Sequence, residues 1–420
     1  MDYILKNGLV YISGRFVKCD LTISNGKVFL NSKPQNLSFK VIDCLNKHIF
    51  PGFIDVHTHL REPGFSYKET IKTGTEAGAS AGYCALFSMP NLKPVPDCVG
   101  NLRIQQEIID KDAVIKVYPY ASITEGQKGE HLVDINSLSK EVKGFSDDGK
   151  GVQDEEMMED AMRLAKQNDS IIVAHCEDEK LLDGGYIHDG EYAKLNGHKG
   201  ISSASEYKQV QRDLELAKRV GAKYHICHLS AKESVEAIRK AKNEGVDVTA
   251  ETAPHYLVLN DMMLIDDGGF KMNPPIRSEE DRLSLIEGIL DGTIDMLATD
   301  HAPHSEEEKS KGLKSLNGIV GLETAFPVIY TDLVKKNIIS LEKVIEIMSI
   351  NPAKRFSLPI GIEDGKDANL CVYDLEKEYA IEPERFLSKG KSTPFKGKKV
   401  FGKCEYNFVD GKLVYELKNN

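Results

Sequence analysis

The chain has 420 residues, with 54 Lys and Arg against 65 Asp and Glu, and its formal net charge at pH 7 is -11. This charge, with the lack of a basic stretch interleaved with aromatic residues, argues against a nucleic-acid partner, whose phosphates require a positive surface. An anionic small molecule would therefore need a local positive site. The length exceeds one average domain but suits a large barrel with an accessory module.

Eight cysteines are scattered singly and without a CxxC pair, which indicates reduced thiols rather than a disulfide framework. The first residues, Met-Asp-Tyr-Ile-Leu-Lys, do not combine a basic region with an apolar one, and nowhere do about 18 apolar residues run together. We therefore expect a soluble, cytoplasmic protein with no membrane partner.

The first 50 residues alternate apolar and polar positions. Three turn dipeptides interrupt this alternation, Asn7-Gly8, Ser13-Gly14 and Asn25-Gly26. Such dipeptides between alternating segments are typical of β-hairpins. We expect short antiparallel strands here and no helix.

Between residues 51 and 355, short apolar runs alternate with longer helix-like segments, which is the pattern of βα units. Eight such runs occur, at residues 53–57, 83–89, 114–120, 142–146, 171–175, 224–228, 246–251 and 296–299. Eight strands, each followed by helical sequence, predict an α/β fold of the (β/α)8 TIM-barrel type. The chemistry of such a barrel gathers at the C-terminal ends of its strands.

After Pro359 the hairpin pattern returns, at residues 369–374 and again at 400–415 around the turn Asp410-Gly411. The Pro-rich and Lys-rich stretch at 389–399 indicates a loop. We expect both chain ends to join in one small β-sandwich module. The predicted domains are residues 1–50 and 356–420 for the two parts of this module, and 51–355 for a metal-dependent catalytic barrel.

The first barrel run ends in two histidines one residue apart, His57 and His59, with Arg61 two residues further on. Alternate side chains of an extended strand face the same side, so both imidazoles can converge on one metal ion and the guanidinium can follow them. The segment therefore predicts a metal site beside a site for an anion.

Four further metal-ligand candidates fall at predicted strand ends: Asp148, His175, His228 and Asp300. Imidazoles together with carboxylates suit zinc. With His57 and His59 the set has four His and two Asp, enough for two zinc ions that share a bridging hydroxide. We therefore expect one or two Zn²⁺ ions per subunit, with two favoured.

Strand parity separates these candidates from their neighbours. His225 lies three residues before His228 and should face the helices, while Cys176, Cys227 and His301 should point away from the metals. The polar surroundings of four other histidines indicate surface positions: His48, His131, His188 and His198.

Longer motifs around the candidates resemble those of dihydroorotase, in the bacterial type I branch of the cyclic amidohydrolases. The motifs are Pro-Gly-Phe-Ile-Asp-Val-His-Thr-His-Leu-Arg-Glu-Pro-Gly at 51–64, Ser-Met-Pro-Asn at 88–91, Phe-Ser-Asp-Asp-Gly at 145–149, Lys-Met-Asn-Pro-Pro at 271–275 and Ala-Thr-Asp-His-Ala-Pro-His at 298–304. The resemblance covers nearly the whole chain. It implies the reversible, zinc-dependent cyclisation of N-carbamoyl-L-aspartate to L-dihydroorotate in pyrimidine (UMP) biosynthesis.

Chemistry and resemblance together suggest roles at the site. Asp300 is the candidate proton shuttle, because a carboxylate beside the metal is well placed for it. Arg61 can form a bidentate pair with the substrate carboxylate. The resemblance implies that Asn91 and His304 help to hold the same carboxylate, and that Asn273 contacts the ring.

Two departures from the family pattern bear on the site. Many related amidohydrolases bridge their metals with a carboxylated lysine, whereas this chain offers Asp148, with Asp147 as fallback and Lys143 as a remote third choice. The loop at 305–317 is rich in Glu and Lys and ends at Asn317, where the family more often has Pro-Phe-Gly. This loop is either a lid or a solvated connection.

Two other functions compete with this prediction. One is a hydantoinase, dihydropyrimidinase or allantoinase activity, whose uncharged rings lack the carboxylate that Arg61 would bind. The other is an inactive structural homologue that associates with aspartate transcarbamoylase, against which the retention of all six ligand candidates argues. A homodimer, and an association of the active enzyme with aspartate transcarbamoylase, are left open.

Overall fold

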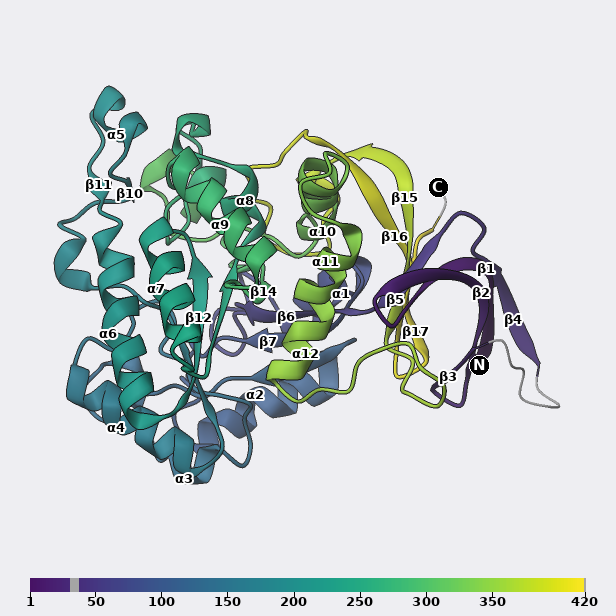
Figure 1. Cartoon of the computed structure of the whole chain (residues 1–420), viewed down its shortest axis with the longest axis horizontal. Coiled ribbons are helices and arrows are strands. Elements are labelled where there is room, and N and C mark those ends of the chain that lie inside the picture. Colours follow the sequence, from purple (N-terminus) through teal and green to yellow (C-terminus); the bar gives the residue numbers. More distant parts are fainter. Residues whose placement is uncertain (31–37, 419–420) are drawn as a thin grey trace.

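Strands from both ends of the chain pair in one sheet, at one side of the molecule (Figure 1). The structure is a computed structural model that describes residues 1–30 and 38–418. The strand order is β17-β16-β15-β5-β1-β2-β3, with β4 paired to β1. The strands are β1 (Asp2–Ile12), β2 (Arg15–Ser24), β3 (Lys27–Leu30), β4 (Phe39–Asp43), β5 (His48–Pro51), β15 (Leu370–Ala380), β16 (Lys399–Val409) and β17 (Lys412–Glu416). The predicted pairing of the two chain ends is thus observed.

One predicted turn is wrong. Ser13-Gly14 and Asn25-Gly26 do connect antiparallel strands, but Asn7-Gly8 lies inside β1, where the register against β2 shifts between Leu5 and Gly8. Asn7 takes a positive φ of 65° there, and its N–H donates to the Asp20 carboxylate at 3.0 Å. An Asn-Gly pair adopts left-handed backbone angles easily, and both a β-bulge and a hairpin turn require such angles.

Short parallel strands occupy the middle of the chain: β6 (Phe53–Thr58), β7 (Tyr83–Ser88), β8 (Lys116–Pro119), β9 (Ile171–Ala174), β12 (Lys223–Leu229), β13 (Val248–Thr252) and β14 (Met296–Leu297). They form two sheets, β6-β7-β8 and β14-β13-β12-β9. Parallel bridges from Phe145 to Ala121 and to Ile172 join the sheets on one side, and a bridge between Thr58 and His301 joins them on the other. The parallel pairings therefore run around a closed ring.

Seven of the eight predicted runs coincide with these strands. The remaining run, at 142–146, pairs only around Phe145, whose N–H donates to the Ile171 carbonyl at 3.0 Å and whose carbonyl accepts from Val173 at 2.8 Å. The segment thus takes its place in the ring without forming a strand of its own.

Helices follow most of the parallel strands and lie outside the ring (Figure 1). They are α1 (Ile71–Ser80), α2 (Val99–Asp112), α3 (Ile135–Leu138), α4 (Glu155–Gln167), α5 (Glu191–Asn196), α6 (Ala204–Val220), α7 (Lys232–Asn243), α8 (Pro254–Val258), α9 (Glu279–Asp291), α10 (Ala325–Ile329), α11 (Leu341–Ile345) and α12 (Asn351–Arg355). A two-stranded sheet of β10 (Ile187–His188) and β11 (Gly200–Ile201) precedes α6. No helix in the described ranges has the length and apolar character that crossing a membrane requires.

Local sequence explains the best-defined helices. Helix α4 begins after Asp154, whose side chain accepts from the Met157 N–H, and its buried face repeats at helical spacing through Met158, Ala161 and Ala165. Helix α9 begins in the same way, with a capping box formed by Ser278 and Asp281.

Aromatic side chains join the terminal sheet to the ring. Phe326 of α10 lies between Phe53 of β6, at a ring-centroid distance of 5.3 Å, and Tyr373 of β15, at 4.5 Å. Phe50 of β5 stacks on Tyr373 at 5.1 Å, and all four rings are buried. This cluster therefore anchors the parallel ring against the sheet built from the chain ends.

We expect Phe326→Ala to lower the free energy of unfolding by about 3–5 kcal/mol, because a buried aromatic ring is lost and a cavity remains. Phe326→Leu should cost less, since it refills part of that volume. The measurement is the urea midpoint at an unchanged slope. Leu290→Ala, at a position that is 52% exposed, is the control and should stay within about 0.5 kcal/mol of the wild type. A Phe326→Ala midpoint equal to that of the control would contradict the anchoring role.

Candidate functional site

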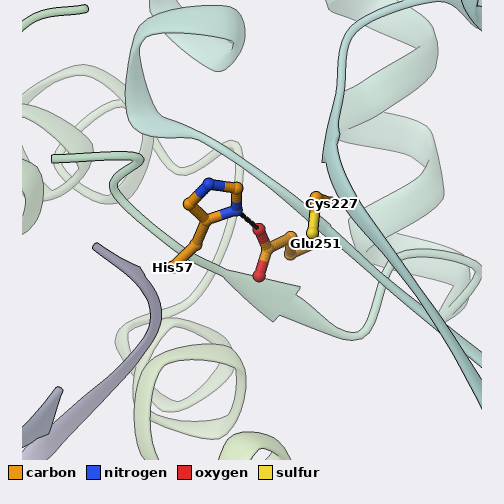
Figure 2. A group of neighbouring side chains, drawn as sticks. All are labelled: His57, Cys227 and Glu251. Carbon is orange, nitrogen blue, oxygen red and sulfur yellow. Dashed lines mark hydrogen bonds and ion pairs between the residues drawn. The ribbon is translucent and has the colours of Figure 1, made fainter. Parts of the chain in front are cut away.

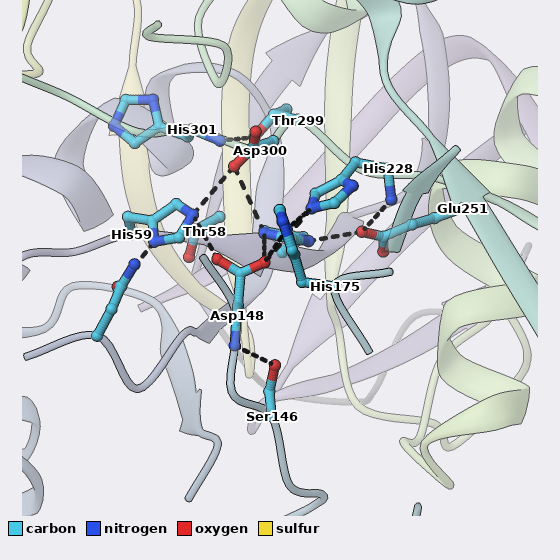
Figure 3. A network of polar contacts seen from close by, with 12 residues as sticks. Thr58, His59, Ser146, Asp148, His175, His228, Glu251, Thr299, Asp300 and His301 are labelled. Atoms are coloured by element: carbon cyan, nitrogen blue, oxygen red, sulfur yellow. Dashed lines mark hydrogen bonds and ion pairs between the residues drawn. The ribbon is translucent and has the colours of Figure 1, made fainter. Parts of the chain in front are cut away.

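The six candidate ligands lie together where the parallel strands end at their carboxyl side (Figure 3). They come from β6 and its end, from the segment after Phe145, from the end of β9, from β12 and from the segment after β14: His57, His59, Asp148, His175, His228 and Asp300. All six are buried. Residues that are far apart in sequence meet here because parallel strands of one ring end at the same rim.

The Asp148 carboxylate occupies the middle of the cluster (Figure 3). Its Oδ1 lies 3.4 Å from His57 Nε2, from His175 Nδ1 and from His228 Nε2, and its Oδ2 lies 3.4 Å from His59 Nε2. The two oxygens thus face different sets of imidazoles. The carboxylate is therefore placed to share a metal centre with all four imidazoles.

Asp300 approaches the cluster from the end of β14. Its Oδ1 lies 3.0 Å from His59 Nε2 and 3.4 Å from His57 Nε2. On the other side of the cluster, His175 Nδ1 and His228 Nε2 are 2.9 Å apart. The donor atoms therefore form overlapping groups of possible ligands, with His57, His59 and Asp300 in one and His57, Asp148 and His228 in another.

The spacing of these atoms matches that of ligands around zinc. Ligands held at about 2.0–2.2 Å in a tetrahedron lie about 3.3–3.6 Å apart, close to most separations in the cluster. His57 Nε2 is fully buried, and the described residues offer it no hydrogen-bond partner. An imidazole nitrogen left in this way among carboxylates suits a metal ligand, so the residues present fit a metal centre.

Outer partners orient three of the four imidazoles. His57 donates its Nδ1–H to Glu251 at 2.7 Å, and His59 donates its Nδ1–H to the Asn91 side-chain oxygen at 2.9 Å. His175 directs its Nε2 toward Glu177, at 3.5 Å. In each case the other ring nitrogen then faces the centre of the cluster, as in metal sites where a hydrogen bond fixes the tautomer of the ligand.

Glu251 was not among the predicted site residues. It ends the seventh predicted run, so its position at a strand end was the available signal, but no spacing rule pairs it with His57. Its carboxylate also accepts from His225 Nε2 at 3.1 Å, which agrees with the prediction that His225 faces away from the centre. Glu177, two residues after His175, was missed as well.

The Cys227 thiol lies near the same carboxylate. Figure 2 shows Glu251 between Cys227 and the His57 ring, with the hydrogen bond to His57 drawn. Cys227 is therefore on the Nδ1 side of His57, opposite the nitrogen that faces Asp148. Burial raises the pKa of the Cys227 thiol above its ordinary range, which disfavours a thiolate ligand.

The charges of the cluster depend on one another. Burial raises the pKa of Asp300, but the hydrogen bond with His59 and the nearby His57 outweigh it and leave the pKa at about 2. Burial lowers the pKa of His57, but the Asp148 carboxylate raises it further, to well above the ordinary value. Burial raises the pKa of Asp148, but His57 and the hydrogen bonds with His175 and His228 lower it to well below its ordinary value. The carboxylates of Asp148 and Asp300 are thus ionised at neutral pH, and cationic partners compensate their charge.

The structure separates the three candidates for the bridging position. The Asp147 carboxylate accepts from the N–H groups of Ile123 at 2.8 Å and Thr124 at 3.2 Å, so it braces the preceding segment. The Lys143 ammonium lies 5.9 Å from the centre of the Tyr118 ring and does not line the cavity. Only Asp148 of the three reaches the imidazoles.

Two of the ligand candidates have a strained backbone. His228 and Asp300 take positive φ angles of 35° and 48°. In β12 the register against β13 shifts between Ile226 and Leu229, so a local irregularity turns His228 toward the cluster. Such strain is often found where the surrounding structure holds a functional residue in place.

A cavity of about 240 Å³ opens over the cluster. Its walls include most of the cluster and all four predicted substrate contacts: Arg61, Asn91, Asn273 and His304. Asn273 donates through its side-chain amide to Glu177 at 3.0 Å. The cavity therefore has the dimensions for a small molecule and combines metal-ligand chemistry with a cationic wall.

Arg61 supplies the positive charge of that wall. It is 8% exposed, has a positive φ of 60°, and donates through Nε to the Pro303 carbonyl at 3.2 Å. Among the described residues no carboxylate lies within 4 Å of its guanidinium. A buried cation that lacks an ionic partner in a cavity is suited to binding an anionic ligand.

His304 lies beside Arg61. Burial and the charges of Arg61 and Lys68 lower the pKa of His304 to about 4, so its ring is neutral at pH 7. Its Nε2–H donates to the Asn317 carbonyl at 2.8 Å, and its Nδ1 lies 3.1 Å from the Glu308 carboxylate and 3.3 Å from the Lys68 ammonium. Arg61 Nη2 lies 3.3 Å from the same Nε2, which offers it no acceptor when that nitrogen carries the proton.

Of the histidines predicted at the surface, His131 is exposed, while His48 and His198 are partly buried. His188 is buried, so its predicted position is wrong; its Nδ1 lies 3.4 Å from Arg277 Nη1. The polar sequence around it gave no sign of this, because the packing comes from a residue 89 positions away. His301 points away from the cluster, with its Nε2 at 3.4 Å from Glu69.

Known proteins are similar to this chain over nearly its whole length. A protein-family model described as "Dihydro-orotase-like" matches residues 46–234. A dihydroorotase of Listeria monocytogenes is 49% identical over 98% of both chains, and one of Fusobacterium nucleatum is 47% identical over 98% of both. Among solved structures, an L-hydantoinase (dihydropyrimidinase) from Arthrobacter aurescens superposes with a TM-score of 0.88 at 26% identity, covering 99% of this chain and 96% of that one.

We expect Glu251→Gln to lower metal affinity by about tenfold or more, because a neutral amide cannot bind His57 and His225 as the carboxylate does. Cys227→Ser is the control and should bind metal like the wild type. Affinity is measured by competition with a chromophoric chelator. Loss of metal from Cys227→Ser, with Glu251→Gln unaffected, would make the thiol the ligand and contradict this assignment.

Proposed function

The chain belongs to the dihydroorotase family, and from this premise we propose that it catalyses the reversible cyclisation of N-carbamoyl-L-aspartate to L-dihydroorotate, a step of pyrimidine biosynthesis. The observation that carries the proposal is the cavity itself, which combines a His and Asp cluster with the buried guanidinium of Arg61. A cyclic amide that carries a carboxylate matches both features. An uncharged ring would leave Arg61 without a partner.

We propose that the closed ring of parallel pairings is a (β/α)8 barrel at residues 51–355. Residues 1–50 and 356–420 would then form a β-sandwich module. Tyr3 of β1 and Phe408 of β16 support the sandwich, because their rings lie 5.0 Å apart although β15 and β5 separate these strands in the sheet. The sheet must fold over on itself to bring the two rings together.

We propose two zinc ions at the cluster. His57, His59 and Asp300 would hold one ion, His175 and His228 the other, with Asp148 as the bridge. The separations of 2.9 to 3.4 Å between their donor atoms support this division. When bound, zinc supplies a water with a pKa of about 7 and polarises the scissile carbonyl.

In the mechanism that we propose, the chain's own residues move the proton and hold the substrate. Asp300 accepts the proton of the attacking water and delivers it to the departing ring nitrogen, and the two roles exchange in ring closure. Its position beside His59 and in the cavity wall supports this role. Arg61 binds the substrate carboxylate through its fork of N–H donors, with Asn91 and His304 beside it and Asn273 near the ring.

The deciding experiment is a spectrophotometric assay with L-dihydroorotate, accompanied by a zinc determination. The purified protein should hydrolyse L-dihydroorotate and act little on hydantoin or dihydrouracil. Ring closure converts a dianion and a proton into a monoanion and water, so acid should favour closure and alkali hydrolysis. Equal or better turnover of an uncharged ring would favour the hydantoinase activity instead. A zinc-loaded protein that turns over neither L-dihydroorotate nor an uncharged ring would favour an inactive structural homologue, with or without aspartate transcarbamoylase as its partner.

We expect Arg61→Lys to raise the KM for L-dihydroorotate more than tenfold without loss of bound zinc. A bidentate, charge-assisted pair contributes on the order of 1.5–3 kcal/mol, and one ammonium cannot reproduce its geometry. Steady-state kinetics and metal analysis of the same preparation test this. A wild-type KM would remove Arg61 from the substrate site.

Asp300→Asn should lower kcat by at least about a hundredfold, because an amide cannot carry the proton. Zinc should remain bound, with weaker affinity, since the other ligands are unchanged. Turnover is measured at saturating zinc. Retention of kcat would show that another group carries the proton, with His304 the next to test.

The apo-protein should regain activity on addition of zinc without bicarbonate. A lysine carbamate must be built from carbon dioxide, whereas the Asp148 carboxylate is already present and ionised. Asp148→Ala should then lower the bound zinc, while Lys143→Ala, the matched control, should keep both zinc and rate. Strict dependence on bicarbonate, or zinc loss in the Lys143 variant alone, would return the bridge to a carboxylated lysine.

A further inference from the structure

A lysine lies buried within the charged loop that follows β14. Lys309 is 8% exposed, although it stands in a run of Glu and Lys residues. Its Nζ donates to the carbonyls of Lys271 at 2.9 Å, Leu316 at 2.8 Å and Gly318 at 2.7 Å. An ammonium has three N–H donors, and each has found an acceptor here.

Backbone carbonyls make all the direct hydrogen bonds to this charge, while the carboxylates of Asp267 and Glu308 favour it from further away. No carboxylate in the described part of the chain lies within 4 Å of the Lys309 ammonium. Burial and the nearby Lys271 lower the pKa of Lys309 to about 7, so holding the charge here costs free energy. Its neighbours Lys311 and Lys314 are exposed. The three hydrogen bonds of Lys309 must therefore offset the free-energy cost of burying its charge.

Two of the three carbonyls flank a residue of the cavity wall. Leu316 and Gly318 lie on either side of Asn317, and all three line the cavity. With both neighbouring peptide groups held, the Asn317 carbonyl stays directed at His304, from whose Nε2–H it accepts at 2.8 Å. His304 in turn lies 3.3 Å from Arg61 Nη2.

The third carbonyl, that of Lys271, connects the segment around Asn317 to the segment that carries Asn273. Lys271 O accepts both from Lys309 and from the Gly318 N–H, the latter at 3.0 Å, and Lys271 stands two residues before Asn273. Gly318 has a positive φ of 131°, and a Cβ on it would lie 2.5 Å from the Ala302 carbonyl. The segment is therefore tightly seated and depends on a defined set of contacts.

We infer that Lys309 is a positioning residue for the carboxylate-binding edge of the cavity: its three bonds to carbonyls hold Asn317 against His304, and thereby set His304 beside Arg61. The inference rests on the proposed function, since it assigns this edge to the substrate carboxylate. Lys309 lies behind the wall and does not itself touch the substrate.

The test is Lys309→Met, which keeps a flexible stem and removes all three donors. The KM for L-dihydroorotate should rise at least tenfold, while kcat stays within about threefold and bound zinc is unchanged. Lys311→Met, an exposed lysine of the same loop, is the matched control and should behave as the wild type. A wild-type KM in Lys309→Met, or a fall in kcat with KM unchanged, would overturn the inference.

Hydrogen exchange gives a second readout, independent of activity. The peptide that covers residues 315–319 should exchange at least tenfold faster in Lys309→Met, with the rest of the chain unchanged. Equal loss of protection over the whole chain, or none at 315–319, would refute a local role. If the Met variant does not fold, Lys309→Gln, which retains two donors on a shorter side chain, should show the same changes to a smaller degree, and a wild-type Gln variant would count against the inference. If the wild-type protein does not act on L-dihydroorotate, the proposed function is refuted. Hydrogen exchange would still decide whether Lys309 holds the segment at 315–319.

Discussion

The buried carboxylate of Asp148 is the constraint on which the rest of the site depends. An ionised carboxylate away from water is costly unless positive charge and hydrogen-bond donors surround it. Four imidazoles lie within 3.4 Å of its two oxygens, and Ser146 Oγ accepts from its backbone N–H at 3.1 Å. Each strand end that delivers an imidazole must therefore keep its register, because a shift of one residue would turn that side chain out of the cluster.

From Asp148 outward, imidazole and carboxylate side chains alternate in a chain of polar contacts. His57 connects Asp148 to Glu251, and Glu251 connects to His225 on the helical side of β12. The Glu251 carboxylate, whose burial raises its pKa while His57 and His225 lower it to about 2, is thus ionised and compensated on both sides. The outer layer orients the rings, so the chemistry of the cavity depends on residues that no ligand touches.

Local patterns predicted much of this arrangement, and their failures share one cause. Strand runs, the six cluster residues and the cationic wall could be predicted from spacing and residue type, because the parallel strands of one ring end at the same rim. The Asn7-Gly8 bulge, the burial of His188 and the roles of Glu251 and Lys309 could not. Glu251, Lys309 and His188 depend on contacts between segments that are distant in sequence. The Asn7-Gly8 pair fits a β-bulge as well as a β-turn, so its sequence does not distinguish the two.

One fold can serve enzymes that act on different rings, because the scaffold and the groups that meet the substrate are separate features of a structure. Solved hydantoinases superpose on nearly the whole chain at 21–26% identity, so the scaffold alone does not select the substrate. Selection falls to the few groups over the cluster that meet the ring substituents. Here that wall contains a buried guanidinium and a neutral imidazole whose one N–H already donates to Asn317. In the function that we propose, an uncharged ring would leave the guanidinium unpaired at a desolvation cost, whereas a substrate carboxylate would offset that cost.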